Sequence, residues 1–350
     1  MSPLTNSAPT RRLPEIPHDA WYVAALSTEV GSTPLARTVL GQRVVLYRTS
    51  TGEAVALTDR CVHAPVALSA GRVEGDEIVA PYSGFRYDRE GRCTSVPTQD
   101  HVPYGARIHA YPVHEDGSFV WVWPGAPRLA GLRRPPATDW LRTSPWTTFG
   151  QEWETEASIR LMQDNFADIT HITQVDPEIA PPALGEGPPP ALEVEVSETS
   201  VSFWRDFPPA PLPPWQSLVM ELPASRRLPQ REEGQFVSPG LWVDRWTVDL
   251  GDGAAARWLF THALTPVSAT STRHVWRISR DFSPGPAVDG TLIPIFTRYY
   301  SRVRDLLEGM QGILDADGPG VEVFVAADAA ATQVRRIMHR LVADEQGLRD

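Results

Sequence analysis

The chain has 350 residues, of which 42% are hydrophobic, 21% charged and 9% aromatic. This composition provides a sizeable core and excludes a largely disordered chain, a collagen and a coiled coil. The formal net charge of −11 disfavours nucleic acid and anionic membrane surfaces as partners. The apolar runs are too short to cross a bilayer, and residues 1–19 lack the apolar core of a signal peptide. With only two cysteines, a disulfide framework is improbable, so we expect a cytoplasmic protein.

The length suits two domains. Residues 1–19 are polar and contain prolines, which indicates a flexible arm. Short β-rich runs separated by turns fill residues 20–125 and predict a compact antiparallel domain. Prolines recur across residues 126–150, which favours a linker. The remaining residues, 151–350, form the second predicted domain.

The second domain mixes the two kinds of regular structure. Apolar spacing predicts helices at residues 156–173, 297–314 and 327–343. Strand-like runs occur at residues 192–204, 242–250, 255–265 and 273–282. We therefore expect an α+β domain with helices packed on an antiparallel sheet. Two proline-rich stretches, 177–190 and 208–214, are predicted to be loops at the rim of a pocket.

A Cys-x-His pair, Cys61 and His63, lies in the first domain. Such a pair could hold a metal ion, but four ligands are normally needed and the nearby sequence offers no second pair. From spacing alone, a buried thiol and a hydrogen-bonded histidine are favoured over a metal site.

A second group of polar residues lies in the predicted helix at 156–173. Asp164, Asp168 and His171 would share one helix face, which points either into a pocket or to solvent. Aromatic residues are spread over the second domain, and several lining a pocket would favour a large apolar ligand. The predicted substrate-binding residues are Trp204, Trp215, Trp242, Trp258 and Tyr299.

In order and spacing, several segments together resemble the oxygenase component of Rieske non-heme iron oxygenases, especially the vanillate O-demethylase-like branch. These segments are residues 21–24, 41–48, 59–63, 68–76, 88–93, 165–171, 261–266 and 272–282. The resemblance implies an N-terminal antiparallel β Rieske-like domain and a C-terminal helix-grip (START-like) catalytic domain.

The resemblance also implies a [2Fe–2S] cluster held by a C-x-H pair and a later C-x-x-H pair. Cys61 and His63 match the first pair, whereas Ala80 and Ser83 stand at the second. A methyl group cannot ligate iron, and a hydroxyl is a poor substitute for imidazole. We therefore expect these four positions to be relics and the cluster to be absent.

The family's mononuclear iron site implies a D-x-x-H-x-x-x-x-H run and a distant aspartate. Asp168 and His171 match the start of this run, Asp176 replaces the second histidine, and Asp317 fits the distant carboxylate. His171, Asp176 and Asp317 would be a weak metal set, so mononuclear iron is doubtful and no cofactor is expected.

From these departures the sequence predicts a metal-independent, non-redox enzyme. It would cyclise, cycloadd or isomerise a large apolar intermediate in natural-product or antibiotic biosynthesis, by holding a reactive conformer in a shaped cavity. The candidate catalytic residues are His171, Asn165, Asp168 and Asp176, as hydrogen-bond donors or as an acid and base. Whether the reaction is pericyclic or acid–base stays open.

Two alternatives remain. The chain could be a non-catalytic partner subunit in a mixed trimer with an intact Rieske oxygenase, and a homotrimer is equally compatible with the resemblance. It could instead be a residual mononuclear-iron oxygenase that uses an external reductant.

Overall fold

The computed structural model describes residues 13–185 and 187–347. They divide into two compact units. The first contains the chain up to Ala137 together with Thr265–Ala269 and the C-terminal segment from Glu345. The second contains Thr138–Leu264 and Thr270–Asp344.

The first unit consists of three small antiparallel sheets, which confirms the predicted β domain. Their strand orders are β1-β10-β9, β2-β3-β4 and β5-β6-β7-β8. The strands are β1 (Tyr22–Leu26), β2 (Leu35–Val39), β3 (Gln42–Arg48), β4 (Ala54–Thr58), β5 (Arg72–Glu74), β6 (Glu77–Val79), β7 (Arg86–Tyr87), β8 (Cys93–Ser95), β9 (Val113–Glu115) and β10 (Phe119–Val122). Short 3-10 turns, η1 (Ser27–Glu29) and η2 (Leu68–Ala70), connect some of them.

Residues 13–19 do not form the flexible arm that was predicted for residues 1–19. Leu13, Ile16 and His18 are buried, and the Tyr22 hydroxyl donates to the Pro17 carbonyl at 2.7 Å. Apolar Leu13 and Ile16 outweigh the surrounding prolines, because their burial is favourable. The remainder of the predicted arm, residues 1–12, lies outside the described residues.

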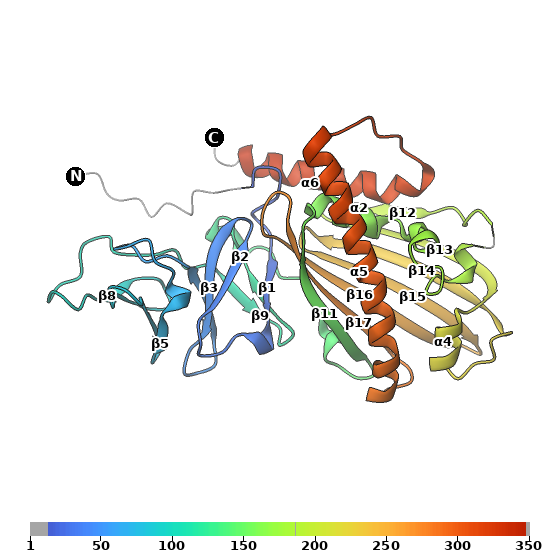
Figure 1. The fold of residues 1–350 in the computed structure, drawn as a ribbon, viewed down its shortest axis with the longest axis horizontal. Coiled ribbons are helices and arrows are strands. Elements are labelled where there is room, and N and C mark those ends of the chain that lie inside the picture. Colours follow the sequence, from blue (N-terminus) through green and yellow to red (C-terminus); the bar gives the residue numbers. More distant parts are fainter. Residues whose placement is uncertain (1–12, 186, 348–350) are drawn as a thin grey trace. The chain divides into compact units, whose positions relative to one another are not determined.

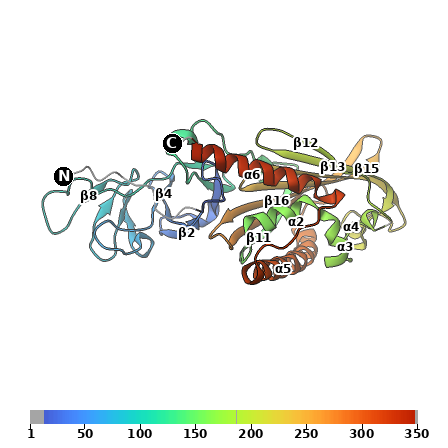
Figure 2. The same cartoon turned by 90° about the horizontal axis from the view of Figure 1, so that it is seen from above.

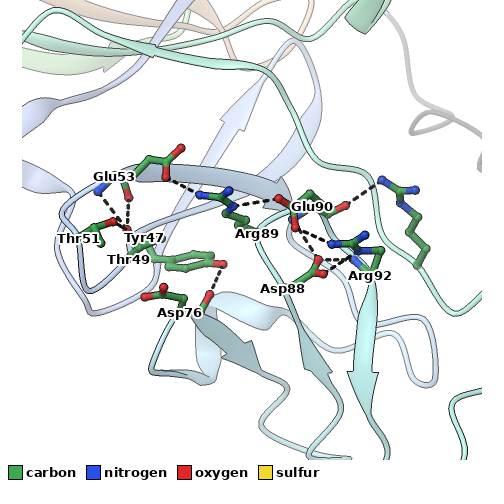
Figure 3. Close-up of polar contacts among 10 residues, drawn as sticks. Tyr47, Thr49, Thr51, Glu53, Asp76, Asp88, Arg89, Glu90 and Arg92 are labelled. Carbon is green, nitrogen blue, oxygen red and sulfur yellow. Dashed lines mark hydrogen bonds and ion pairs between the residues drawn. The ribbon is translucent and has the colours of Figure 1, made fainter.

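One exposed ion pair joins the β3–β4 hairpin to the β7–β8 hairpin, and further pairs lie within the β7–β8 turn (Figure 3). Arg89 contacts Glu53 at 2.8 Å and Glu90 at 2.9 Å, and Arg92 contacts Asp88 at 2.8 Å. Because these side chains are largely solvated, each pair contributes little stability. The network fixes the loop geometry rather than the core.

The second unit is built on a seven-stranded sheet, in which β12 to β17 follow in chain order and β11 lies at the edge beside β17 (Figure 1). The strands are β11 (Thr147–Thr155), β12 (Glu193–Val196), β13 (Val201–Pro211), β14 (Arg227–Ser238), β15 (Leu241–Gly251), β16 (Ala254–Pro266) and β17 (Thr272–Arg280). This unit and the β unit confirm the predicted α+β class.

Helices pack against this sheet. The long α5 (Pro286–Asp317) contacts β11, and α2 (Ile159–Ala167) contacts β15. Figure 2 shows α5 and α2 beside the strands when seen from above. The other helical elements are α1 (Pro127–Ala130), η3 (Asp139–Leu141), η4 (Ile169–His171), α3 (Ile172–Val175), η5 (Pro182–Leu184), α4 (Pro214–Val219), η6 (Ala326–Asp328) and α6 (Ala329–Gly347). Among the described helices, none combines the length and apolar character of a membrane span.

The helix predicted at residues 156–173 starts later than expected and is interrupted once, at Asp168. It starts at α2, where Ser158 is the N-cap, and it stops at Asp168, whose φ of −142° and ψ of 107° are extended. The Asp168 carboxylate then caps η4 by accepting from the Thr170 backbone at 2.9 Å. Aspartate favours such caps over helix interiors. Asp164, Asp168 and His171 therefore do not share one helix face.

The proline-rich stretch predicted as a loop at residues 208–214 is largely strand. β13 continues to Pro211 with a register shift between Phe207 and Ala210. β12 pairs only with Val201–Trp204, so beyond that point one side of β13 is an edge. Prolines are tolerated at edges and bulges because no ladder donor is required there.

Candidate functional site

The second unit contains a cavity of about 90 Å³ over one face of its sheet. Aromatic rings dominate its walls: Trp215, Trp246, Trp258, Phe260, Phe296 and Tyr299. For comparison, an apolar cavity of about 150 Å³ accommodates one benzene. The large ligand that these rings suggested from sequence is not accommodated in this conformation, because the rings fill much of the space that they surround.

Strand register places acidic side chains on the same face as these rings. Glu232 of β14 lies opposite Trp246 of β15, and Gly234 lies opposite Asp244. Residues two apart in a strand share a face, so Glu232 and Asp244 are diagonal neighbours at the cavity. Gly234 is required between them, because a Cβ atom there would lie 2.0 Å from the Phe203 ring.

Glu232 is an unsatisfied buried acid. Glu232 is only 2% exposed, and within the described residues neither of its side-chain oxygens has a hydrogen-bond partner. The nearest cation is Arg205, whose Nη1 lies 3.6 Å from Oε2. Burial raises the pKa of Glu232 to about 7, although Arg205 opposes the shift. Such a group is costly unless a ligand or a proton compensates it.

Asp244 is held beside it by a tryptophan. Trp242 Nε1 donates to Oδ1 at 2.6 Å, and His262 Nε2 lies 3.7 Å from Oδ2. Burial raises the pKa of Asp244 well above its ordinary value, and the charge of Glu232 adds to this shift. The next contact inward joins His262 Nδ1 to His274 Nε2 at 3.0 Å. Burial lowers the pKa of both histidines, that of His274 to about 3, so neither supplies a cation near neutral pH.

His171 and Asn165 line the same cavity. His171 Nδ1 lies 2.6 Å from the Asp168 carbonyl oxygen, which can only accept, so Nδ1 carries the proton. Nε2 therefore accepts from the Tyr299 hydroxyl at 3.1 Å. Burial lowers the pKa of His171. The imidazole is neutral and both its nitrogens have partners.

The two other candidate catalytic acids do not line the cavity. Asp168 accepts from Thr170 and lies 3.8 Å from Arg205. Asp176 is fully buried and contacts Arg298 at 3.0 Å and Arg302 at 3.1 Å. Both acids therefore already form ion pairs with arginines of the chain.

The suggested metal set of His171, Asp176 and Asp317 is not brought together. Asp317 is exposed at the end of α5, about 27 Å along the helix axis from Tyr299, which contacts His171. Within the parts of the chain that the structure describes, no three His, Cys, Asp or Glu side chains are grouped to hold a metal ion.

Of the five predicted substrate-binding residues, Trp215, Trp258 and Tyr299 line the cavity, whereas two lie elsewhere. Trp204 stands on the opposite face of β13, next in sequence to Phe203, with the Arg231 guanidinium 5.6 Å from its ring centre. Trp242 is fully buried among Phe166, Phe203 and Phe236, where it orients Asp244.

Sequence reasoning missed Glu232, Asp244 and Gln216, which all line the cavity. A signal was available for one of them. In the predicted strand at 242–250, Asp244 alternates with Trp242 and Trp246, so an acid occupies a position of the apolar face. A charged residue on a buried face indicates function.

In the first unit, the implied cluster positions form a hydrogen-bonded group. Cys61 Sγ lies 3.3 Å from the Tyr87 hydroxyl and 3.6 Å from Ser83 Oγ. These hydrogen bonds outweigh burial and lower the pKa of Cys61. His63 is exposed and stacks on Phe85 with ring centres 4.9 Å apart.

Comparison with known proteins identifies both units. Residues 20–112 match the family model of the Rieske [2Fe-2S] domain. Residues 155–344, more than half of the chain, match that of the vanillate O-demethylase oxygenase C-terminal domain. The chain belongs to the vanillate O-demethylase-like Rieske oxygenase components. This confirms the resemblance stated from sequence.

Individual relatives agree over the whole length. A putative toluene-4-sulfonate monooxygenase system iron-sulfur subunit from Comamonas testosteroni is 28% identical, over 94% of this chain and 98% of its own. A vanillate O-demethylase oxygenase subunit from a Pseudomonas species is 27% identical, over 95% and 97%. Dicamba monooxygenase bound to 3,6-dichlorosalicylic acid shares the fold, with a TM-score of 0.87 and 24% identity over 94% of this chain and 98% of its own.

These findings contradict two expectations from sequence. The relatives are named as monooxygenases and demethylases, which points to oxygenase activity rather than a non-oxidative cyclase. The expectation of no cofactor is likewise contradicted, because the matching domain is a [2Fe-2S] domain and a structure of dicamba monooxygenase contains non-heme iron. Both expectations relied on departures from the family's ligand pattern at three positions, Ala80, Ser83 and Asp176.

The donor set of this chain fits neither iron group by itself. At the implied cluster positions it offers one thiol and one imidazole. Ala80 has no atom that can ligate iron, and the Ser83 hydroxyl is hydrogen-bonded to Cys61. A [2Fe–2S] cluster of this type needs four ligands. At the implied mononuclear site, Asp176 is engaged by two arginines.

Proposed function

We propose that this chain is a subunit of a Rieske-type oxygenase and that its second unit binds the small organic molecule to be oxygenated. The observation that carries the proposal is the cavity, with aromatic walls and a few convergent polar groups. That combination is typical of small-molecule sites, in which rings supply the contact area and polar groups fix the orientation. Its volume favours a compact ligand.

The chain's own residues can position and shield such a ligand. The rings of Trp215, Trp258 and Phe296 contact one another, with centres 5.3 to 6.2 Å apart, and form one apolar wall of the cavity. The Tyr299 hydroxyl donates to His171 Nε2, and this hydrogen bond fixes the positions of both side chains at the cavity wall. A ligand bound in one orientation has already lost its rotational and translational freedom, so the entropic part of the barrier to its oxygenation is smaller.

The first test identifies the bound molecule. Chain purified from its source cells is denatured, and the released small molecules are measured by mass spectrometry. Ile172→Trp fills the cavity from α3 and should reduce the released ligand at least tenfold. Leu218→Trp, the same bulky change at an exposed site on α4, should leave it unchanged. Equal release from both variants would contradict the proposal.

The second test concerns oxygenation. The released molecule is incubated under ¹⁸O₂ in extracts of source cells with and without this chain. An oxygenase subunit predicts a labelled product that depends on the chain. A chain-dependent product without label would show that the reaction is not an oxygenation.

A second candidate is a partner subunit within a mixed oxygenase trimer. The incomplete donor set at Cys61, His63, Ala80 and Ser83 favours it, because intact subunits would then provide the complete sets. Native mass spectrometry of the assembly from source cells tests it. A homo-oligomer as the species active in the labelling experiment would exclude it.

A further inference from the structure

The cavity combines aromatic walls with an excess of acid. Asp168, Glu232 and Asp244 lie in or directly behind it, and Arg205 is the cation that contacts two of them, at 3.8 Å and 3.6 Å. Glu233 and Arg245 also reach the cavity, but they face each other at 3.7 Å and leave the balance unchanged. The neutral histidines add no positive charge.

The buried polar atoms lack partners on the side of the cavity. Across the residues that the structure describes, both oxygens of Glu232 and the amide nitrogen of Gln216 have no hydrogen-bond partner, although each residue is only 2% exposed. Buried polar groups are normally satisfied, and exceptions call for a ligand or water. Both residues line the cavity. The missing partner of Glu232 is a donor, whereas that of the Gln216 amide is an acceptor, which water can supply.

The placement of the charges determines which ligand fits. Of the described residues, those lining the cavity include Glu232 and Asp244 but not Arg205, so a ligand meets the carboxyl groups before the guanidinium. An anion would be repelled there, whereas a cation would be attracted by the acids and by the faces of the surrounding rings. A neutral ligand would leave the carboxyl groups to be compensated by protons alone, and it would gain no charge–charge attraction.

We infer that the cavity takes a small organic amine, whose protonated nitrogen donates to Glu232 and Asp244 while its carbon skeleton packs against the aromatic rings. This inference rests on the proposed function of the cavity as the ligand site and names the class of ligand. The raised pKa of both acids supports it, because burial favours a positive partner for each carboxylate, and a proton and the ligand's cation would compete for that place.

A matched series of probes tests the inference. Isobutylamine, isobutanol and isobutyrate have similar size and differ in charge. Their affinities for the full chain are measured by ligand-observed NMR titration at pH 8. The amine should bind at least tenfold more tightly than the alcohol, and isobutyrate should bind most weakly. Equal or tighter binding of the alcohol or of isobutyrate would overturn the inference.

Variants locate the effect. Glu232→Gln should weaken isobutylamine binding at least tenfold and change isobutanol binding less than twofold. Glu195→Gln removes the same charge from an exposed site on β12 and should change neither. If Glu232→Gln does not fold, Asp244→Asn provides the same test, since its side-chain oxygen still accepts from Trp242. An unchanged affinity for the amine in the folded variant would overturn the inference.

The outcomes separate this inference from the proposed function. If isobutanol binds and Ile172→Trp abolishes its binding, but the amine gains nothing, the cavity is a ligand site and the amine class is wrong. If none of the three probes binds, both the amine class and the ligand site fail.

Discussion

Glu232 shows how one buried carboxyl group couples the ligand site to stability. Its pKa is raised from 4.5 to about 7 in the folded chain, chiefly by burial. The folded state therefore binds more protons than the unfolded state between these values. The stabilising contribution of the protonated acid is complete below about pH 4.5 and is lost as the pH rises through about 7.

We predict that the free energy of unfolding of the wild-type chain falls by up to about 3 kcal/mol between pH 5 and pH 8 through this group. Glu232→Gln resembles the protonated acid and cannot ionise, so its unfolding free energy should fall less over the same range. Urea denaturation at pH 5, 6.5 and 8 measures both. Parallel curves for the wild type and the variant would show that Glu232 ionises normally.

Asp176 is a buried charge whose partners are half exposed. Arg298 and Arg302 reach it from α5 and thereby tie α3 to that helix. Asp176→Asn removes the negative charge that pairs with both arginines. We therefore predict that the unfolding free energy falls by about 2 kcal/mol. Glu178→Gln is the control, because Glu178 also contacts Arg298 at 3.0 Å but its side chain is 78% exposed. That change should cost less than about 0.5 kcal/mol, and equal costs would contradict the argument.

At the scale of elements, β13 and β14 fit together because one residue has no side chain. The Phe203 ring occupies the space where a Cβ of residue 234 would stand. Gly234→Ala should destabilise the chain by about 1 to 3 kcal/mol, since well-packed cores resist added volume. Gly290→Ala lies in α5 with open space around the added carbon and should be neutral or stabilising by up to about 1 kcal/mol. Thermal unfolding of both variants measures the difference.

The same strand explains what the sequence could not predict. Runs with apolar alternation, such as 255–265 and 273–282, were predicted as strands and match β16 and β17. β14 was missed because its inward positions include Gln230, Glu232 and Gly234, so the apolar period of two disappears. Each position has its own reason: Glu232 lines the cavity, Gln230 accepts from Trp246 at 3.1 Å, and Gly234 leaves room for the Phe203 ring. Local packing and hydrogen bonding therefore removed the apolar pattern on which the prediction relied.

Part of the candidate site was predictable and part was not. Asn165, His171, Trp215, Trp258 and Tyr299 were predicted as site residues and line the cavity. Asp168 was placed on a helix face, but an aspartate can end a helix as well as continue it, and only the surrounding packing decides. Asp317 fits the distant carboxylate of the family's iron motif by its position in the sequence. In the structure, however, the length of α5 separates it from the cavity.

At the scale of the whole molecule, the first unit is assembled from three separate pieces of the chain. Besides the residues up to Ala137, it includes Thr265–Ala269 and the segment from Glu345. The Thr265 hydroxyl donates to the Val23 carbonyl at 2.7 Å, and the Leu40 amide donates to the Pro266 carbonyl at 2.7 Å. The Asp19 amide donates to Glu345 at 2.6 Å. The N-terminal segment therefore carries buried donors and acceptors whose partners lie over a hundred residues later in the chain.

A fragment that ends at Ala137 should consequently be less stable than the same unit in the full chain. Three buried hydrogen bonds are lost, each contributing about 1 kcal/mol, and the groups left unpaired add a desolvation cost. We predict a deficit of at least about 3 kcal/mol, measured by amide hydrogen exchange in β1, β3 and β10. Thr265→Val in the full chain removes one of these bonds and should cost about 1 kcal/mol, which calibrates the loss. Equal protection of the fragment and the full chain would mean that the later segments only cover a unit that is already complete.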